Sequence, residues 1–173
     1  PAKWSRVRGP GACRRAFLTL SMSDSRANSQ VIAHPGGTVR VVQLTDTHLC
    51  RSEGGTLLGM DTDHSLQAVI DLVKTERPAI DLLLGTGDLS DQGAPEAYRR
   101  LGGYFAQLTD NNFWLPGNHD DRASMERESD RPLRLCREIR LGRWQVVMLD
   151  SQVPGLVGGE LGPEELALLE SAL

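Results

Sequence analysis

Three short polar clusters carry the residue types from which proteins build metal centres. They are Thr45–His48, Thr86–Asp88 and Gly117–Asp120. Together they supply carboxylate oxygens, imidazole nitrogens and an amide oxygen, and none of them contains a thiol. This set of donors suits manganese, iron or zinc. The clusters therefore favour a metal site.

The spacing inside the clusters fits such a site. Asp46 and His48 are two residues apart, and in an extended segment such residues point to the same side, so both can reach one cation. Gly87 lets the backbone turn sharply, which brings Asp88 to the same place. Since a carboxylate has two oxygens, Asp88 can bridge two cations about 3.5–4 Å apart.

Each cluster alone also has a simpler interpretation. An Asp-x-His triplet arises by chance, a Gly-Asp pair after a strand is usually a turn in which Asp caps the next helix, and Gly-Asn-His-Asp can be an ordinary polar loop. Turn chemistry does not explain why all three follow strand-like segments in this order. The joint pattern favours one shared site.

The elements that must position these clusters alternate along the chain. Apolar runs predict strands at 39–44, 80–84, 113–115 and 144–149. Apolar spacing and helix-starting prolines predict helices at 64–76, 95–108 and 163–169. This order is typical of an α/β fold with a largely parallel first sheet. Because the carboxyl ends of parallel strands meet at one edge, where open sheets bind ligands, we expect the three clusters to meet there.

Composition excludes several classes of protein. The 173 residues are 39% hydrophobic and 24% charged, which is typical of one globular domain. Residues 41–173 carry twelve basic against twenty-two acidic side chains, so we expect no nucleic-acid partner. No apolar run approaches the roughly 20 residues that span a bilayer, so no membrane partner is expected either. Three cysteines without a CxxC pair argue against disulfides and favour the cytoplasm.

The first 37 residues differ from the rest. They are basic, with Gly and Pro scattered through them, and the chain begins with Pro1 rather than Met. They are either a transit peptide or basic tail, or an upstream extension with Met22 as the true start. We expect 1–37 to be a disordered or spurious leader that adds little to the core, and 38–173 to be the functional domain.

The clusters and their surroundings resemble the calcineurin-like metallophosphoesterases. Asp-x-His, Gly-Asp and Gly-Asn-His-Asp match the first three signature blocks of that superfamily. The likeness extends over residues 39–173 and is closest to the bacterial 3′,5′-cyclic AMP phosphodiesterases, the class III enzymes. The matching runs are VVQLTDTHLC, LLGMDTDHSLQAVIDLV, LLLGTGDLSDQGAPEAY, FWLPGNHDD and VVMLDSQVPGLVGGELG. The resemblance implies the N-terminal half of a four-layer α/β/β/α sandwich.

The resemblance also implies a role for each cluster residue. Asp46 and His48 would bind the first metal, and Asp88 would bridge both. Asn118 would bind the second metal and the substrate. His119 would lie beside the scissile phosphate as general acid or charge stabiliser, and Asp120 would orient its imidazole.

The implied reaction is hydrolysis of 3′,5′-cyclic AMP to 5′-AMP. Two divalent or mixed-valence ions, iron or manganese with zinc and magnesium as alternatives, would offset the repulsion between the phosphodiester and a hydroxide. The alternatives are another nucleotide or a phosphomonoester as substrate, or a non-catalytic remnant that binds one metal or a partner. The superfamily's later histidine blocks are missing from this sequence, so we expect a fragment or a truncated gene product. The oligomeric state stays open.

Five other residues attract attention. His34 and His64 are the remaining histidines; we expect the first in a mobile tail and the second at a helix start, and neither as a substitute ligand. Trp114 can stack on a base, but its position before a turn favours the core. Arg99 and Arg100 are expected on a solvated helix face.

Overall fold

The computed structural model describes residues 29–76, 79–129 and 134–173. Its strands are β1 (Ser29–Ile32), β2 (Val41–Leu44), β3 (Thr56–Leu57), β4 (Met60–Asp61), β5 (Leu82–Thr86), β6 (Asn112–Leu115), β7 (Glu138–Leu141) and β8 (Trp144–Val147). Its helices are α1 (Thr62–Glu76), α2 (Pro95–Ala106), α3 (Arg122–Glu128) and α4 (Pro163–Ala172). Among the described residues, no helix is both long and apolar enough to cross a membrane.

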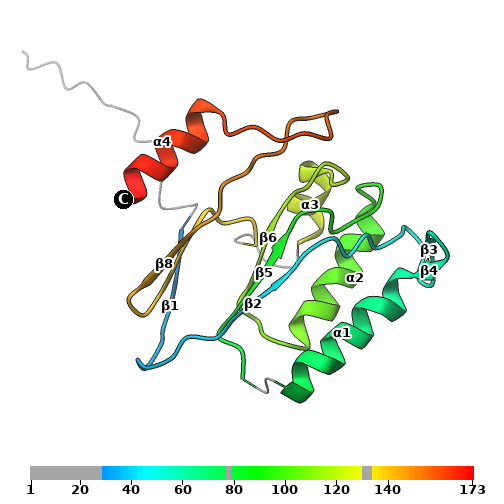
Figure 1. Cartoon of the computed structure of the whole chain (residues 1–173), viewed down its shortest axis with the longest axis horizontal. Coiled ribbons are helices and arrows are strands. Elements are labelled where there is room, and N and C mark those ends of the chain that lie inside the picture. The colour runs from blue at the N-terminus through cyan, green and yellow to red at the C-terminus, as the bar shows by residue number, and fades with distance from the viewer. Residues whose placement is uncertain (1–28, 77–78, 130–133) are drawn as a thin grey trace, which may run out of the picture.

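The first sheet has the order β2-β5-β6, and both of its strand pairs are parallel. The sequence prediction of a parallel first sheet is therefore confirmed. In Figure 1 these strands run side by side at the centre of the molecule, with α1 and α2 on one side of them. All three strands end at the same edge, and the polar clusters follow these ends.

The second sheet has the order β1-β7-β8, with β1 and β7 parallel and β7 and β8 antiparallel. It faces the first sheet (Figure 1). Leu82 and Phe113 of the first sheet and Ile139 and Leu141 of the second belong to one buried cluster. Helices, first sheet and second sheet thus form three layers, as expected for part of the α/β/β/α sandwich.

The other face of the first sheet packs against α1 and α2. Successive strand residues point to opposite faces, so Leu83 joins the helical cluster, with Ile70 and Phe105, while its neighbour Leu82 faces the second sheet. Trp114 is only 1% exposed within this helical cluster. It is a core residue, and the alternative of stacking on a base is not supported by its burial.

Part of the expected leader is structured. Residues 1–28 lie outside the described part of the chain, but Ser29–Ile32 forms β1, and Ile32 packs against the cluster between the sheets. The expectation that residues up to 37 add little to the core is therefore wrong for β1. A strand of four residues is too short to show a periodic apolar pattern in the sequence, and its partner β7 lies far along the chain. His34 also lies against the fold, with Nε2 3.7 Å from Oδ1 of Asp81.

Arg100 is a second correction. Its guanidinium bonds the carboxylate of Asp63 and the backbone oxygen of Cys50, and its side chain is only 20% exposed. Asp63 is itself buried. The pair joins α2 to the start of α1, so this arginine is structural and does not lie on a solvated face. His64, in contrast, is exposed in the first turn of α1, as predicted.

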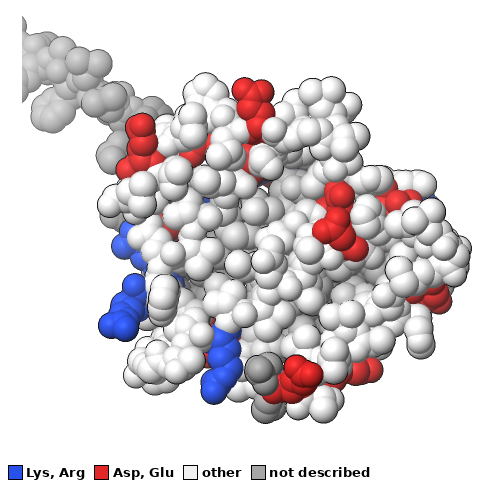
Figure 2. All heavy atoms as spheres, in the orientation of Figure 1, with Lys and Arg blue, Asp and Glu red and all other residues white. Residues whose placement is uncertain are grey.

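Charge is unevenly distributed over the surface. On the face shown in Figure 2, the basic side chains gather at the lower left, over the second sheet, while acidic side chains occupy the upper edge and the right-hand side. The helices and the polar loops lie on that acidic side (Figure 1). An excess of negative charge concentrates cations near these loops.

Candidate metal centre

Backbone hydrogen bonds hold the three polar loops together beyond the strand ends. The amide of Asp46 donates to the carbonyl of Gly87 (3.0 Å), and the amide of His48 donates to that of Asp88 (2.9 Å). On the other side, the amide of Gly87 donates to the carbonyl of Leu115 (3.0 Å). Each loop is therefore fixed to its neighbour, and the three clusters share one edge of the sheet.

The site residues adopt an unusual backbone conformation. Asp46, His48 and Asp88 have φ of 55°, 42° and 49°, in the left-handed region that non-glycine residues rarely enter. Gly87, at φ 93°, adopts such a conformation without strain. We predicted that an extended segment aims Asp46 and His48 at one cation, but the backbone is not extended there. Such strain, about 1–3 kcal/mol per residue, persists where the surroundings impose it, which is typical of functional sites.

Asp46, His48 and Asp88 form the first cluster of potential ligands. Nε2 of His48 lies 3.9 Å from Oδ1 of Asp46 and 3.8 Å from Oδ2 of Asp88. One ligand atom from each residue falls within 4.8 Å of the others. These distances are too long for hydrogen bonds but leave room for a cation between the atoms. Two carboxylates and an imidazole fit manganese, iron or zinc.

The second oxygen of Asp88 faces another loop. Its Oδ1 accepts a hydrogen bond from the backbone amide of His119 (3.0 Å). Gly117 lies so close that a Cβ there would be 2.3 Å from this oxygen. Asn118 is exposed in the same loop, between these two residues. The carboxylate of Asp88 thus lies between the Asp46–His48 loop and the Asn118 loop, as a bridging ligand must.

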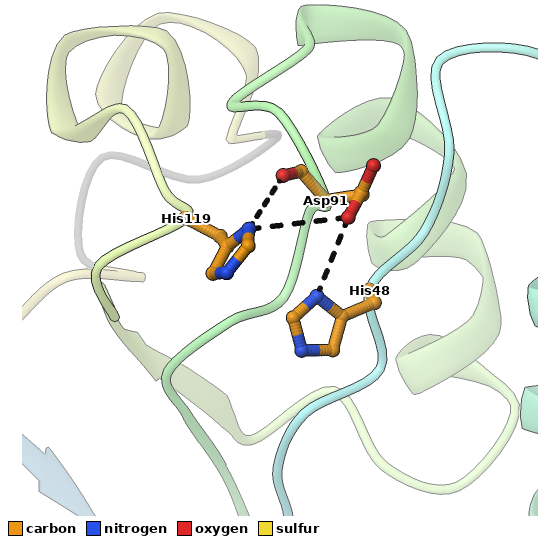
Figure 3. A group of neighbouring side chains, drawn as sticks. All are labelled: His48, Asp91 and His119. Atoms are coloured by element: carbon orange, nitrogen blue, oxygen red, sulfur yellow. Dashed lines mark hydrogen bonds and ion pairs between the residues drawn. The ribbon is translucent and has the colours of Figure 1, made fainter. Parts of the chain in front are cut away.

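Asp91 completes a second cluster, which sequence reasoning did not single out. Its Oδ1 lies 3.7 Å from Nδ1 of His48 and 3.9 Å from Nδ1 of His119. Figure 3 shows the carboxylate between the two rings, whose centroids are 4.8 Å apart. The backbone oxygen of Asp91 also lies 2.8 Å from Nδ1 of His119. The only sequence signal was a further acid three residues after Asp88.

The tautomer of His119 follows from this contact. A carbonyl oxygen only accepts hydrogen bonds, so Nδ1 of His119 carries the proton that it donates to Asp91. Its Nε2 faces away from Asp91 (Figure 3). Nδ1 of His48 is buried and has no hydrogen-bond partner among the described residues. A ring whose Nε2 binds a metal commonly directs Nδ1 to a carboxylate, and Asp91 is the group in that position.

Asp120 does not orient the ring of His119. Its buried carboxylate accepts hydrogen bonds from the backbone amides of Leu89, Ser90 and Gly117 and from the hydroxyl of Tyr98. Burial raises the pKa of this carboxyl above its ordinary value, and the four donors oppose that increase. Asp120 instead joins the loop after β5 to the loop after β6.

A cavity of about 310 Å³ adjoins the first cluster. Its polar wall is the loop Thr45–His48, and its apolar wall comes from the β3–β4 hairpin and α1, through Leu57, Met60, Leu66 and Val69. A mostly apolar hollow beside a few polar groups is the usual form of a small-molecule site. It offers space for an organic group next to the candidate metal position.

Comparison with known proteins finds relatives of this chain among cyclic-nucleotide phosphodiesterases. The chain is 43% identical over 136 residues to the 3′,5′-cyclic adenosine monophosphate phosphodiesterase CpdA of Pseudomonas aeruginosa. It is 39% identical over 136 residues to a 3′,5′-cyclic-nucleotide phosphodiesterase of Nostoc sp. (strain PCC 7120). It is 31% identical over 148 residues to a cAMP/cGMP dual specificity phosphodiesterase of Mycobacterium tuberculosis (strain CDC 1551 / Oshkosh).

These matches cover 79%, 78% and 81% of this chain but only 50%, 51% and 46% of the relatives. The chain therefore spans about half the length of the curated relatives it matches. A model of the calcineurin-like phosphoesterase family matches residues 39–158, which include all three polar clusters and Asp91. The chain belongs to the calcineurin-like phosphoesterase family.

Proposed function

We propose that this chain carries the first metal-binding half of a phosphodiesterase that hydrolyses 3′,5′-cyclic AMP to 5′-AMP at a two-metal centre. The observation that carries the proposal is the position of Asp88. One of its oxygens faces Asp46 and His48, and the other faces the loop of Asn118. The names of the relatives support the substrate class.

The residues of the site would have different roles. Asp46 and His48 would hold the first metal, Asp88 would bridge, and Asn118 would hold the second metal and contact the substrate. Bound metal ions, iron or manganese in this proposal, would supply positive charge that offsets the phosphodiester anion and activates water. The hollow beside Asp46 would take the nucleoside part of the ester.

His119 would supply the proton for the leaving 3′-oxygen. Nδ1 of His119 donates its proton to the backbone oxygen of Asp91. A second proton, on Nε2, would make the ring a cation that can donate this proton to the leaving oxygen. Oδ1 of Asp91 lies 3.9 Å from Nδ1 of the same ring. The orienting role first expected of Asp120 therefore passes to Asp91 in this proposal.

A second candidate is a protein that binds one metal without catalysis. Three potential ligands surround the first position within 4.8 Å, whereas among the described residues this proposal assigns Asp88 and Asn118 to the second. Fewer ligands bind a cation more weakly. The number of metal ions bound per chain, measured by titration with Mn²⁺, separates one site from two.

In this proposal the functional domain covers residues 38–173, and β1 precedes it. The substrate would be a small cyclic nucleotide, and the protein would act in the cytoplasm. Cys50 and Cys136 are free thiols in the structure, in keeping with a reducing compartment.

The decisive assay loads the purified chain with Mn²⁺ or Fe²⁺ and offers cyclic AMP and bis-p-nitrophenyl phosphate, beside an Asp88→Ala variant. Hydrolysis of cyclic AMP that Asp88→Ala abolishes supports the proposal. Cleavage of the generic ester alone refutes the cyclic AMP assignment. Bound metal without turnover of either ester favours the single-metal alternative.

A further inference from the structure

The segment that follows β8 contacts the loop of Asn118 and His119. The side-chain amide of Gln152 donates one hydrogen bond to the carbonyl of Gly117 (2.6 Å) and another to the carbonyl of Asp120 (2.8 Å). These carbonyls belong to the residues on either side of Asn118 and His119. A single side chain thus joins both ends of the loop that carries them.

Gln152 is itself held in place. Its backbone amide donates to Oδ1 of Asp150 (2.9 Å), and Oδ2 of Asp150 pairs with Nη1 of Arg122 (2.5 Å). Arg122 is the first residue of α3, directly after the loop. Asp150 therefore fixes the backbone of Gln152 and connects it to the element in which the loop ends.

Helix α4 anchors this segment to the second sheet. The carboxylate of Glu165 accepts a hydrogen bond from the backbone amide of Asp150 (2.9 Å) and pairs with Arg137. Arg137 also donates to the carbonyl of Met148, just after β8 (2.8 Å). In Figure 1 the segment leaves β8, passes the end of β6 on the side of α3, and returns to α4. The contact with the loop is therefore supported from the second sheet.

Other hydrogen bonds of the loop hold it to the loop that follows β5. Asn118 and His119 are both exposed. Within the loop, the amide of Gly117 donates to the side-chain carboxylate of Asp120, and the amide of Asp120 donates to the carbonyl of Gly117 (3.2 Å). The amide of His119 donates to the carboxylate of Asp88. These bonds shape the turn, whereas Gln152 links it to the segment after β8, beside the ion pair of Arg122 with Asp150.

We propose that Gln152 is a positioning residue, which holds Asn118 and His119 over Asp88 by bonding the carbonyls of Gly117 and Asp120. The proposal rests on the proposed function for the roles of Asn118 and His119, but the contact itself does not depend on it. Loss of the amide removes both bonds between the loop and the segment after β8, so the tip fluctuates more over Asp88.

The test compares Gln152→Met with Gln145→Met in the full chain. Methionine keeps the length of glutamine but donates no hydrogen bond. Gln145 is a matched control, since its exposed side chain also donates to a backbone carbonyl, that of Ala172 in α4. Amide hydrogen exchange is measured by NMR without metal, with the amide of Leu83 in β5 as internal reference.

We expect the amides of His119 and Asp120 to exchange roughly 5- to 100-fold faster in Gln152→Met, which corresponds to the loss of two hydrogen bonds. The reference amide and the Gln145→Met variant should keep wild-type rates. Equal loop exchange in both variants overturns the proposal, and so does a uniform increase across the protein, because that indicates global destabilisation.

A Mn²⁺ titration followed by EPR separates this proposal from the proposed function. If both hold, Gln152→Met weakens the second Mn²⁺ about 10-fold or more and leaves the first unchanged, because Asn118 belongs to the second position. If the wild-type chain binds no Mn²⁺, the metal proposal fails, and the exchange result alone decides whether Gln152 holds the loop.

Discussion

Substitution of Gly117 by alanine tests whether close packing holds Asp88 in place. A Cβ on Gly117 would lie 2.3 Å from Oδ1 of Asp88 and 2.4 Å from its backbone nitrogen, where ordinary contacts are 3.4–4 Å. The loop must therefore move by about 1 Å, which breaks the 3.0 Å hydrogen bond between the amide of His119 and Asp88. We expect the free energy of unfolding to fall by about 1–3 kcal/mol.

The same displacement separates the ligands around Asp88. We expect the affinity for Mn²⁺ to fall by at least about 10-fold, since a 1 Å misplacement in a site costs up to about 100-fold. Isothermal titration calorimetry with Mn²⁺ and urea unfolding measure the two effects. Gly103→Ala is the matched control, because a Cβ there meets nothing within 4 Å, and in helix α2 it should stabilise by about 0.5–1 kcal/mol. Wild-type Mn²⁺ affinity and stability in Gly117→Ala would refute the reasoning.

Three further predictions concern neighbouring groups. Asp91→Asn keeps the backbone carbonyl that bonds His119 but removes the charge between the two rings, so Mn²⁺ affinity or turnover should fall about 10–100-fold; an unchanged value would show that the carboxylate is not needed. Asp63→Asn leaves the half-buried Arg100 without its charged partner and should lower the free energy of unfolding by about 3–5 kcal/mol in urea titrations, whereas Asp71→Asn, at an exposed acid, should change it little. Burial, followed by the charge of Asp63, raises the pKa of Tyr104 to about 12, and burial together with Asp120 raises the pKa of Tyr98 even further. The folded state thus holds both phenol protons more tightly, so their contribution to stability is present below about pH 10 and is lost as the pH rises through the raised values. Alkaline titration of tyrosinate absorbance should therefore show little ionisation near pH 10 in the folded protein and normal ionisation in urea; normal ionisation of the folded protein would contradict this.

The sequence was informative where an apolar run ends in a polar cluster. The strands that became β2, β5 and β6 are short apolar segments, and their order along the chain predicts a parallel sheet whose carboxyl ends meet. Asp46, His48 and Asp88 could therefore be placed together without coordinates. The bounds shifted by one or two residues, as in β5, which begins at Leu82 and includes Gly85 and Thr86, because backbone pairing continues past the apolar residues.

The parts that sequence could not supply depend on backbone conformation and distant pairing. Residue type predicts the left-handed φ at Asp46 and His48 poorly, since Asp and His enter that region more often than most residues but still rarely. Asp91 lies in a polar turn without periodicity, and its place between two rings follows from the contact of that turn with the first loop. The family resemblance implied an orienting role for Asp120, but its carboxylate points into the core, toward Tyr98.

Anomalous diffraction from crystals soaked in Mn²⁺ tests the central claim most directly. We predict a peak between Asp46, His48 and Asp88, with Mn–O and Mn–N distances of about 2.0–2.3 Å, and loss of the peak in Asp88→Ala crystals. A fully soaked crystal with no peak among these three side chains, or with manganese bound only elsewhere, would contradict the account.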